Sequence, residues 1–494
     1  MSNKQSHPKA LYTLFATEMW ERFSYYGMRA LLTLYLTAEL AKGGFGLNRE
    51  DSLAIYAIFT GLVYLTPILG GWIADKYLGK RKTVYVGGLT MMVGQFLLAA
   101  SAFMVHSLDA ETRLFVFNFG LGVLIIGNGF FKPNISTIVG DFYDDNDPRK
   151  DSAFNIFYMG INLGAILGPF IAGALGENVH WGWGYFAAGV GMLIGVLWMK
   201  AREASLEDKG LPPNTPEGKL LIDAKDWSQI IMYAAGLIVG TFILISIWRM
   251  LPDNVASIIT YVGFAAGALG LGSVIYKGTN GAEEWTRMIV ILVLAFFNIA
   301  FWAGFEQAGG TMNLFAAENT NRVVFGWDMP ASWFQNINPI AILIFAPIFS
   351  VMWLKLDKMK LNPRTPIKFA IGLFLGALAF WIMTMASNAA AGGNMVSPLW
   401  LVAVYFILTL GELMLSPIGL SMITKLAPTK LGSVVMGLWM ASFAAGNYLA
   451  GMMESILHKY NFELYPFIMW LMIGSGACLV ILSPMLNKFM KGIH

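Results

Sequence analysis

The feature that most constrains this chain is a series of long apolar stretches separated by short polar segments. The hydrocarbon core of a bilayer is about 30 Å thick, and an α-helix needs roughly 20 predominantly apolar residues to cross it. Fourteen such stretches can be placed along the 494 residues. We therefore predict an all-α polytopic membrane protein. The predicted helices span residues 13–41, 52–74, 82–105, 112–138, 152–174, 181–199, 227–250, 255–276, 286–316, 331–354, 365–386, 398–424, 430–457 and 464–487.

The composition argues against several other classes of protein. Only 13% of the residues are charged, whereas soluble proteins average about a quarter, which disfavours a cytosolic multidomain enzyme. The single cysteine, Cys478, excludes an intramolecular disulfide framework and a cysteine-based zinc site. The first ten residues lack the apolar stretch of a secretory signal. No phosphate-binding loop, zinc-ligand pair or nucleophile elbow stands out, so we expect neither an enzyme nor an ATP-driven pump.

The distribution of basic residues predicts the orientation of the chain. Lys and Arg accumulate in the cytoplasmic loops of membrane proteins. With the N-terminus inside, the inner segments hold 24 Lys and Arg and the outer loops hold 6. This asymmetry predicts that both termini are cytoplasmic. It also supports the count of fourteen helices, because a miscount by one would scramble the alternation.

The hydrophilic connections divide the chain into four parts. The longest connection follows the sixth predicted helix and precedes two apolar helices whose middles lack ionisable residues. We interpret these two helices as a peripheral pair added to two six-helix bundles. The predicted parts are an N-terminal six-helix bundle (1–200), a cytoplasmic linker (201–226), two inserted transmembrane helices (227–277) and a C-terminal six-helix bundle (278–494).

The two bundles carry glycine and proline residues in matching positions. Gly127 and Pro133 recur, shifted by 284 residues, as Gly411 and Pro417. Paired halves with proline-interrupted helices in corresponding positions are typical of transporters that alternate access to a site near the middle of the membrane.

Seven ionisable residues lie inside predicted spans, where charge is costly. A charge at the centre of a span costs about 2.5 to 3.5 kcal/mol on insertion scales, so such residues normally face a partner or a water-filled cavity. The seven are Glu18, Glu21, Arg22, Arg29, Lys132, Glu306 and Glu412. They are spread over both predicted bundles. This favours a functional charge network, although a network that only locks helices together is the alternative for any single residue.

The first helix carries most of these charges on one face. Glu18, Arg22, Tyr25 and Arg29 are spaced by 4, 3 and 4 residues, which stacks them along one side of a helix that cannot face lipid. Four acidic against three basic residues leave one carboxylate without a permanent partner. Because desolvation disfavours the charged form of a carboxyl group, that group is suited to carry a proton together with a zwitterionic solute.

These residues resemble a known family. Residues 18–27 match the signature E-x-x-E-R-F-x-Y-Y-G of the proton-dependent oligopeptide transporter family, which belongs to the major facilitator superfamily. Two further blocks, 70–80 and 157–164, match in order. The resemblance implies the major facilitator fold with two six-helix bundles and two inserted helices. It also implies symport of di- and tripeptides with protons, no cofactor besides the coupling proton, no metal, no nucleic-acid partner, and a place in the lipid of a bacterial inner membrane.

The resemblance further implies roles for individual residues. Arg22 and Lys132 would receive the peptide carboxylate, and Glu412 the peptide ammonium. Asn162 and Asn338 would form hydrogen bonds to the peptide. The side-chain pockets would be lined by Tyr25, Tyr26, Tyr64 and Trp439. The proton-coupling residues would be Glu18, Glu21, Lys132 and Glu306, with Glu18 and Glu21 pairing with Lys132. Arg29 and Glu306 would form an extracellular gate that protonation of Glu306 releases.

Two rival functions stay open at this point. One is the same fold transporting another solute, such as nitrate or an organic anion. A site for a lone anion does not need an opposing carboxylate, so Glu412 favours a peptide. The other is a peptide receptor or channel that does not concentrate its ligand.

Overall fold

The computed structural model of the protein describes residues 6–144, 147, 149–212, 272–428 and 430–491. The predicted helix at 227–250 lies outside these residues, as does most of the one at 255–276 and most of the predicted linker. The prediction of an inserted pair of helices therefore falls almost entirely outside the described part of the chain.

The N-terminal half is helical throughout. It consists of α1 (Lys9–Thr37), η1 (Leu40–Lys42), α2 (Arg49–Ile73), η2 (Ala74–Leu78), α3 (Lys80–Phe103), η3 (Met104–His106), α4 (Ala110–Gly140), α5 (Lys150–Gly168), η4 (Pro169–Gly173), α6 (Ala174–Asn178), α7 (Trp181–Ala201) and η5 (Glu203–Leu206). The η elements are single 3-10 or π-helical turns.

The C-terminal half is helical apart from one short hairpin. It consists of α10 (Gly281–Phe305), η6 (Glu306–Gly309), α11 (Thr311–Glu318), β1 (Val323–Val324), β2 (Trp327–Asp328), η7 (Ala331–Asn336), α12 (Ile337–Lys358), α13 (Thr365–Ala390), α14 (Leu399–Leu426), α15 (Gly432–Lys459) and α16 (Leu464–Phe489). The strands β1 and β2 are antiparallel.

The helices confirm a polytopic membrane fold. Eleven helical segments in the described chain are long and apolar enough to cross a membrane. The helix α1 is also long, at 29 residues, and its charged side chains Glu18, Glu21, Arg22 and Arg29 are buried inside the protein. Burial against other helices explains how so polar a helix lies among apolar ones.

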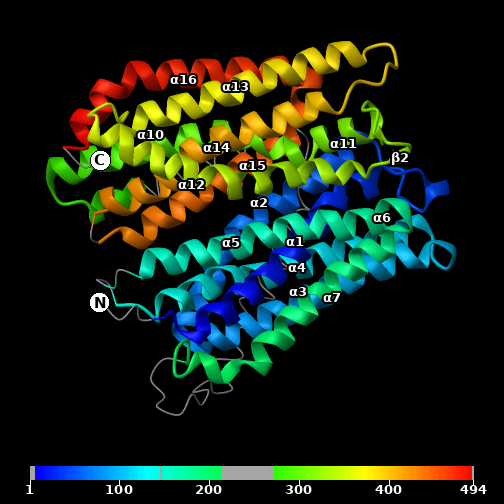
Figure 1. Ribbon diagram of the computed structural model, residues 1–494, viewed down its shortest axis with the longest axis horizontal. Coiled ribbons are helices and arrows are strands. Elements are labelled where there is room, and N and C mark those ends of the chain that lie inside the picture. Colours follow the sequence, from blue (N-terminus) through cyan, green and yellow to red (C-terminus); the bar gives the residue numbers. More distant parts are fainter. Residues whose placement is uncertain (1–5, 145–146, 148, 213–271, 429, 492–494) are drawn as a thin grey trace.

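Each half has its own apolar core. One cluster of buried side chains draws on residues from Ala10 to Leu206. The other draws on residues from Ile275 to Met490 and is joined by Leu34 and Leu53 of the first half. The two bundles lie side by side with their helices along the long axis, and the N- and C-terminal ends lie at the same end of the molecule (Figure 1). We refer to this end as the terminal end and to the other as the far end.

Small residues let α1 pack closely against α5. A Cβ atom at Gly160 would lie 2.9 Å from Phe15 O, and one at Gly168 would lie 2.6 Å from Phe23 O. With Gly164 between them, these glycines are spaced four apart, and such spacing of small residues is typical of closely packed helices. This packing holds the charged face of α1 in a fixed position relative to α5.

The predicted continuous helix at 286–316 is wrong in one respect, because the chain breaks between α10 and α11. At Gly310 the backbone leaves the helical region, with φ −103° and ψ −109°. Contacts with α1 replace the helical hydrogen bonds there: Thr33 Oγ1 donates to Gly309 O at 3.0 Å, and Asn313 Nδ2 donates to Ala30 O at 2.9 Å. The break places Glu306 at the end of α10, facing α1.

Candidate substrate cavity

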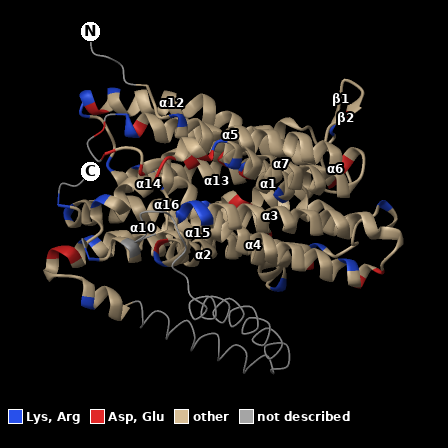
Figure 2. Ribbon diagram, turned by 90° about the horizontal axis from the view of Figure 1, so that it is seen from below, with Lys and Arg blue, Asp and Glu red and all other residues tan. Residues whose placement is uncertain are grey.

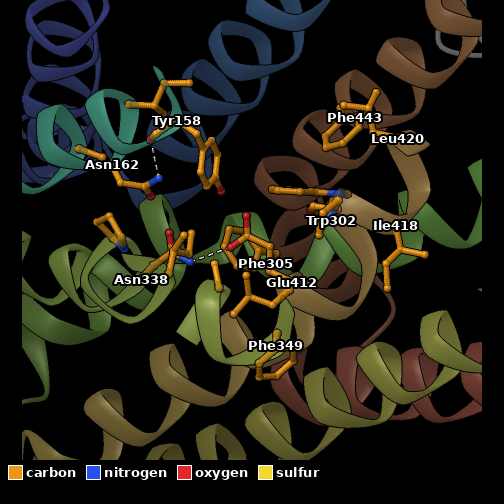
Figure 3. A pocket seen from close by; sticks show the side chains of 18 of the residues that line it. Tyr158, Asn162, Trp302, Phe305, Asn338, Phe349, Glu412, Ile418, Leu420 and Phe443 are labelled. Atoms are coloured by element: carbon orange, nitrogen blue, oxygen red, sulfur yellow. Dashed lines mark hydrogen bonds between the residues drawn. The ribbon is translucent and has the colours of Figure 1, made fainter. Parts of the chain in front are cut away.

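A large cavity lies between the two halves. Its volume is about 1140 Å³, slightly above the range of roughly 300 to 1,000 Å³ that is usual for small-molecule sites. Its wall includes Tyr158 and Asn162 of α5 on one side and Asn338, Glu412 and Phe443 of the C-terminal half on the other (Figure 3). The cavity is therefore built by both bundles together.

The cavity extends toward the terminal end. Its lining includes Asn155 near the start of α5, Lys368 near the start of α13 and Lys425 at the end of α14. In the opposite direction the lining residues reach Arg29 and Glu306. The arrangement is that of a pocket closed toward the far end.

One wall presents a carboxylate held by an amide. Asn338 Nδ2 donates to Glu412 Oε2 at 2.8 Å and to Thr409 Oγ1 at 3.0 Å. Within the described chain, no Lys or Arg nitrogen lies within 4 Å of the Glu412 carboxylate. On the facing wall, Asn162 Nδ2 donates to Tyr158 O at 2.9 Å (Figure 3). The carboxylate of Glu412 is thus oriented and free to pair with a cation that enters the cavity.

A buried ion pair closes the inner end of the cavity. Arg29 Nη2 lies 2.6 Å from Glu306 Oε2, and both side chains are less than a tenth exposed. Tyr56 OH donates to Glu306 Oε2 at 3.1 Å and accepts from Arg29 Nη2 at 3.2 Å. A Cβ atom at Gly309 would lie 2.5 Å from Tyr56 OH, so glycine is required for this approach. The pair joins α1 to the end of α10, across the two halves.

A second charged cluster lies on α1 itself. Arg22 Nε lies 3.1 Å from Glu18 Oε1, and Arg22 Nη2 donates to Glu21 Oε1 at 2.8 Å. Asn128 Nδ2 of α4 donates to Glu21 Oε1 at 3.1 Å. The other oxygen of Glu18, Oε2, is buried without a hydrogen-bond partner among the described residues. The cluster therefore holds two carboxylates on one guanidinium, with one acceptor left unsatisfied.

The structure differs from the prediction that Glu18 and Glu21 pair with Lys132. Within the described residues, no carboxylate oxygen lies within 4 Å of Lys132 Nζ. That ammonium instead lies 4.2 Å from the centre of the Tyr64 ring. The physical reason is reach, because Arg22 is on the same helix as both carboxylates: its guanidinium contacts Glu21 through two nitrogens and Glu18 through one.

The Tyr64 ring connects Lys132 to the cavity wall. It stacks on Phe443 of the other half, with ring centres 5.8 Å apart and planes 13° apart. Phe443 in turn packs against Trp302, with ring centres 4.8 Å apart. A cation on α4 and the aromatic wall of the C-terminal half are thus linked by one ring.

The predicted site residues fall into two groups. Those that line the cavity are Tyr26, Arg29, Tyr64, Asn162, Glu306, Asn338, Glu412 and Trp439. Those outside its lining are Glu18, Glu21, Arg22, Tyr25 and Lys132. Trp439 is only 1% exposed, and it packs edge-on against Phe443.

Sequence reasoning missed several residues of this region. Tyr56 and Asn128 carry no sign of their role in the sequence, because their partners lie on other helices. Trp302 and Tyr158 could have been found, since each lies four residues before a predicted site residue, Glu306 or Asn162, and therefore on the same helical face. Most other charged residues of the described chain lie near the ends of the bundle (Figure 2).

The comparisons with known proteins agree with this architecture. The model of the POT family matches residues 81–471. The chain is 36% identical to the peptide transporter YePEPT of Yersinia enterocolitica over 93% of this chain and 90% of that protein. It is 33% identical to a di-/tripeptide transporter of Lactococcus lactis over 99% and 97% of the two chains. A crystal structure of the peptide transporter POT in complex with sulfate superposes with a TM-score of 0.85 at 36% identity, covering 98% of this chain and 96% of that one.

Proposed function

The chain belongs to the POT family, and we propose that it is a proton-coupled symporter that imports di- and tripeptides by alternating access. The observation that carries this proposal is the cavity between the halves, with a cation-free carboxylate on one wall and amide groups on both. Similar proteins are named peptide transporters.

A peptide needs two charged ends and an amide to be recognised, whatever its side chains. We propose that its ammonium pairs with Glu412 and that Asn162 and Asn338 form hydrogen bonds to its backbone. The apolar and aromatic walls would accept varied side chains, because they impose shape without fixed polar partners. This division explains how one site serves many peptides.

The peptide carboxylate would be received by Arg22 and Lys132, as expected from the resemblance. Neither residue lines the cavity in this state. The Lys132 ammonium lies against the ring of Tyr64, which does line the cavity, so binding in this way would require this contact to rearrange. It would also require Arg22 to exchange a carboxylate of its own helix for that of the peptide.

Proton coupling would act at two places. Protonation of Glu306 would remove the charge that holds Arg29 and so release the pair that closes the cavity. In the α1 cluster two carboxylates share the guanidinium of Arg22. Glu18 is the better proton carrier of the two, because its Oε2 is buried without a hydrogen-bond partner among the described residues and a proton there removes the excess negative charge. The proton is the only coupling ion that we propose.

The proposed setting is a bacterial inner membrane with both termini in the cytoplasm. The cavity then extends toward the cytoplasm, and the Arg29 to Glu306 pair lies on the extracellular side of the site. Lipid would surround the outer faces of both bundles.

The test is uptake of a labelled dipeptide into liposomes that contain the purified protein. We expect accumulation above the external concentration only when an inward proton gradient is imposed. Uptake that stops at the external concentration with the gradient present would indicate a channel or receptor. Competition by nitrate but not by tripeptides would indicate a transporter for a different solute.

A further inference from the structure

The carboxylate of Glu177 bridges the two halves at the far end. Glu177 lies in the last turn of α6, and its side chain is 11% exposed. Its two oxygens accept hydrogen bonds from Ala331 N at 2.7 Å and from Ser332 N at 3.0 Å. These amides open η7, which continues directly into α12. A side chain of the N-terminal half therefore caps a helix of the C-terminal half.

The capped helix has no cap of its own. The residue before η7 is Pro330, and it provides no side-chain hydrogen bond to the first turn. The first amides of a helix need acceptors from elsewhere, and a carboxylate there also interacts favourably with the helix dipole. By comparison, α4, which also begins at the far end, is capped locally, because Asp109 accepts from Thr112 N within the same half at 2.8 Å. Glu177 thus caps this helix from the other half of the protein, whereas an ordinary N-cap comes from the residue that precedes the helix.

Neighbouring contacts make this a specific interface. The rings of Phe170 and Trp333 stack with centres 4.3 Å apart, and Trp333 Nε1 donates to Phe170 O at 3.2 Å. A Cβ atom at Gly173 would lie 3.1 Å from Ser332 Cβ. Each contact joins the α5–α6 segment of one half to the start of the η7–α12 segment of the other.

We propose that Glu177 is an interbundle latch that holds the far end of the cavity closed. The inference rests on the proposed alternating access, in which the two halves must separate at this end. Separation would transfer both amides of η7 and the carboxylate of Glu177 to water, which can satisfy all of them. The latch is therefore reversible, and its strength sets the population of the state open at the far end.

The test measures the distance between the halves at the far end. Nitroxide labels are placed by Val179→Cys and Met395→Cys, two exposed positions in the two halves, after Cys478→Ser removes the only native cysteine. Pulsed electron paramagnetic resonance then reports the ratio of short to long distances between the two labels in the full chain, with and without dialanine. We expect Glu177→Gln to raise the long-distance population about tenfold, because glutamine offers one acceptor oxygen where Glu177 offers two and lacks the charge that strengthens the remaining hydrogen bond.

Matched variants separate the latch from a general loss of stability. Asp109→Asn removes the charge of a cap within one half and should leave the ratio unchanged. Trp333→Phe keeps an aromatic ring for stacking but removes the hydrogen bond from Nε1 to Phe170 O, and should shift the ratio in the same direction as Glu177→Gln. It provides a second test if Glu177→Gln does not fold.

Each outcome has a distinct meaning. If the unmodified pair shows both distances and neither Glu177→Gln nor Trp333→Phe changes their ratio, the latch is refuted while alternating access stands. If the unmodified pair shows one unchanging distance under all conditions, alternating access is refuted and the latch with it. An equal shift in Asp109→Asn would also refute the latch, because the effect would then not depend on crossing between the halves.

Discussion

Replacing Glu412 by glutamine tests the proposed pairing with the peptide ammonium. The variant Glu412→Gln keeps the size of the side chain and an oxygen that can accept from Asn338, whose amide donates to Oε2 at 2.8 Å. What it loses is the negative charge. Truncating one partner of a buried, hydrogen-bonded charge pair costs about 2 to 5 kcal/mol. Because Glu412 lines an open cavity rather than a dry interior, we take the lower end, about 2 kcal/mol, which is roughly a 30-fold loss of affinity.

The assay compares two ligands that differ only at the amino end. Competition for binding of a labelled dipeptide is measured with dialanine and with N-acetyl-dialanine, which has no ammonium. We expect Glu412→Gln to weaken dialanine and to leave the acetylated ligand at the low affinity it has for the unmodified protein. Glu39→Gln, at a side chain that is 70% exposed and outside the cavity lining, is the control and should change neither. Equal losses for both ligands, or no loss for dialanine, would refute the ammonium role.

Two further predictions concern the gate and the pH dependence of stability. Glu306→Gln leaves Arg29 without its counter-charge, and we expect it to abolish proton-driven accumulation while peptide exchange across the liposome membrane continues; retained accumulation would remove Glu306 from the coupling. His180 caps α7 by accepting from Gly182 N at 3.1 Å, and its pKa is lowered, first by burial and then by the charge of Arg113. The folded protein therefore binds this proton less readily than the unfolded chain, and stability is lost as the pH falls through the unfolded value near 6.5. In the unmodified protein the melting temperature should fall as the pH is lowered from about 7.5 to about 5.5. The fall should be smaller in His180→Asn, because an asparagine cap does not titrate. An identical fall in both proteins would contradict this account.

The positions of the helices could be predicted because the bilayer dictates them. A hydrocarbon layer of fixed thickness demands a minimum apolar length, and each helix must satisfy its own backbone hydrogen bonds. The break at Gly310 could not be predicted in this way. It depends on hydrogen bonds from Thr33 and Asn313 that join α1 to η6 and α11, and no local sequence pattern indicates a partner that lies more than 250 residues away.

The candidate site shows the same limit at the level of side chains. The buried charges could be identified because charge is costly in a span, but the choice of partner depends on geometry. Arg22 holds both Glu18 and Glu21, and Lys132 lies against Tyr64 instead. By contrast, the pairing of Arg29 with Glu306 was expected, and Arg29 Nη2 lies 2.6 Å from Glu306 Oε2. That expectation came from a family resemblance and not from spacing.

The placement of the ionic contacts between the halves gives the closed end a physical basis. Arg29 pairs with Glu306, Arg49 of α2 lies 2.9 Å from Glu318 and 2.6 Å from Glu454, and Glu177 caps η7. All of these contacts lie at or beyond the inner end of the cavity, toward the far end. A peptide bound between Glu412 and the N-terminal half would add a bridge on the terminal side of them. Because that bridge favours closure at the terminal end, where the cavity is open, it lowers the free-energy cost of separating the halves at the far end. Substrate binding and opening of the far end are thereby coupled through the same two rigid bundles.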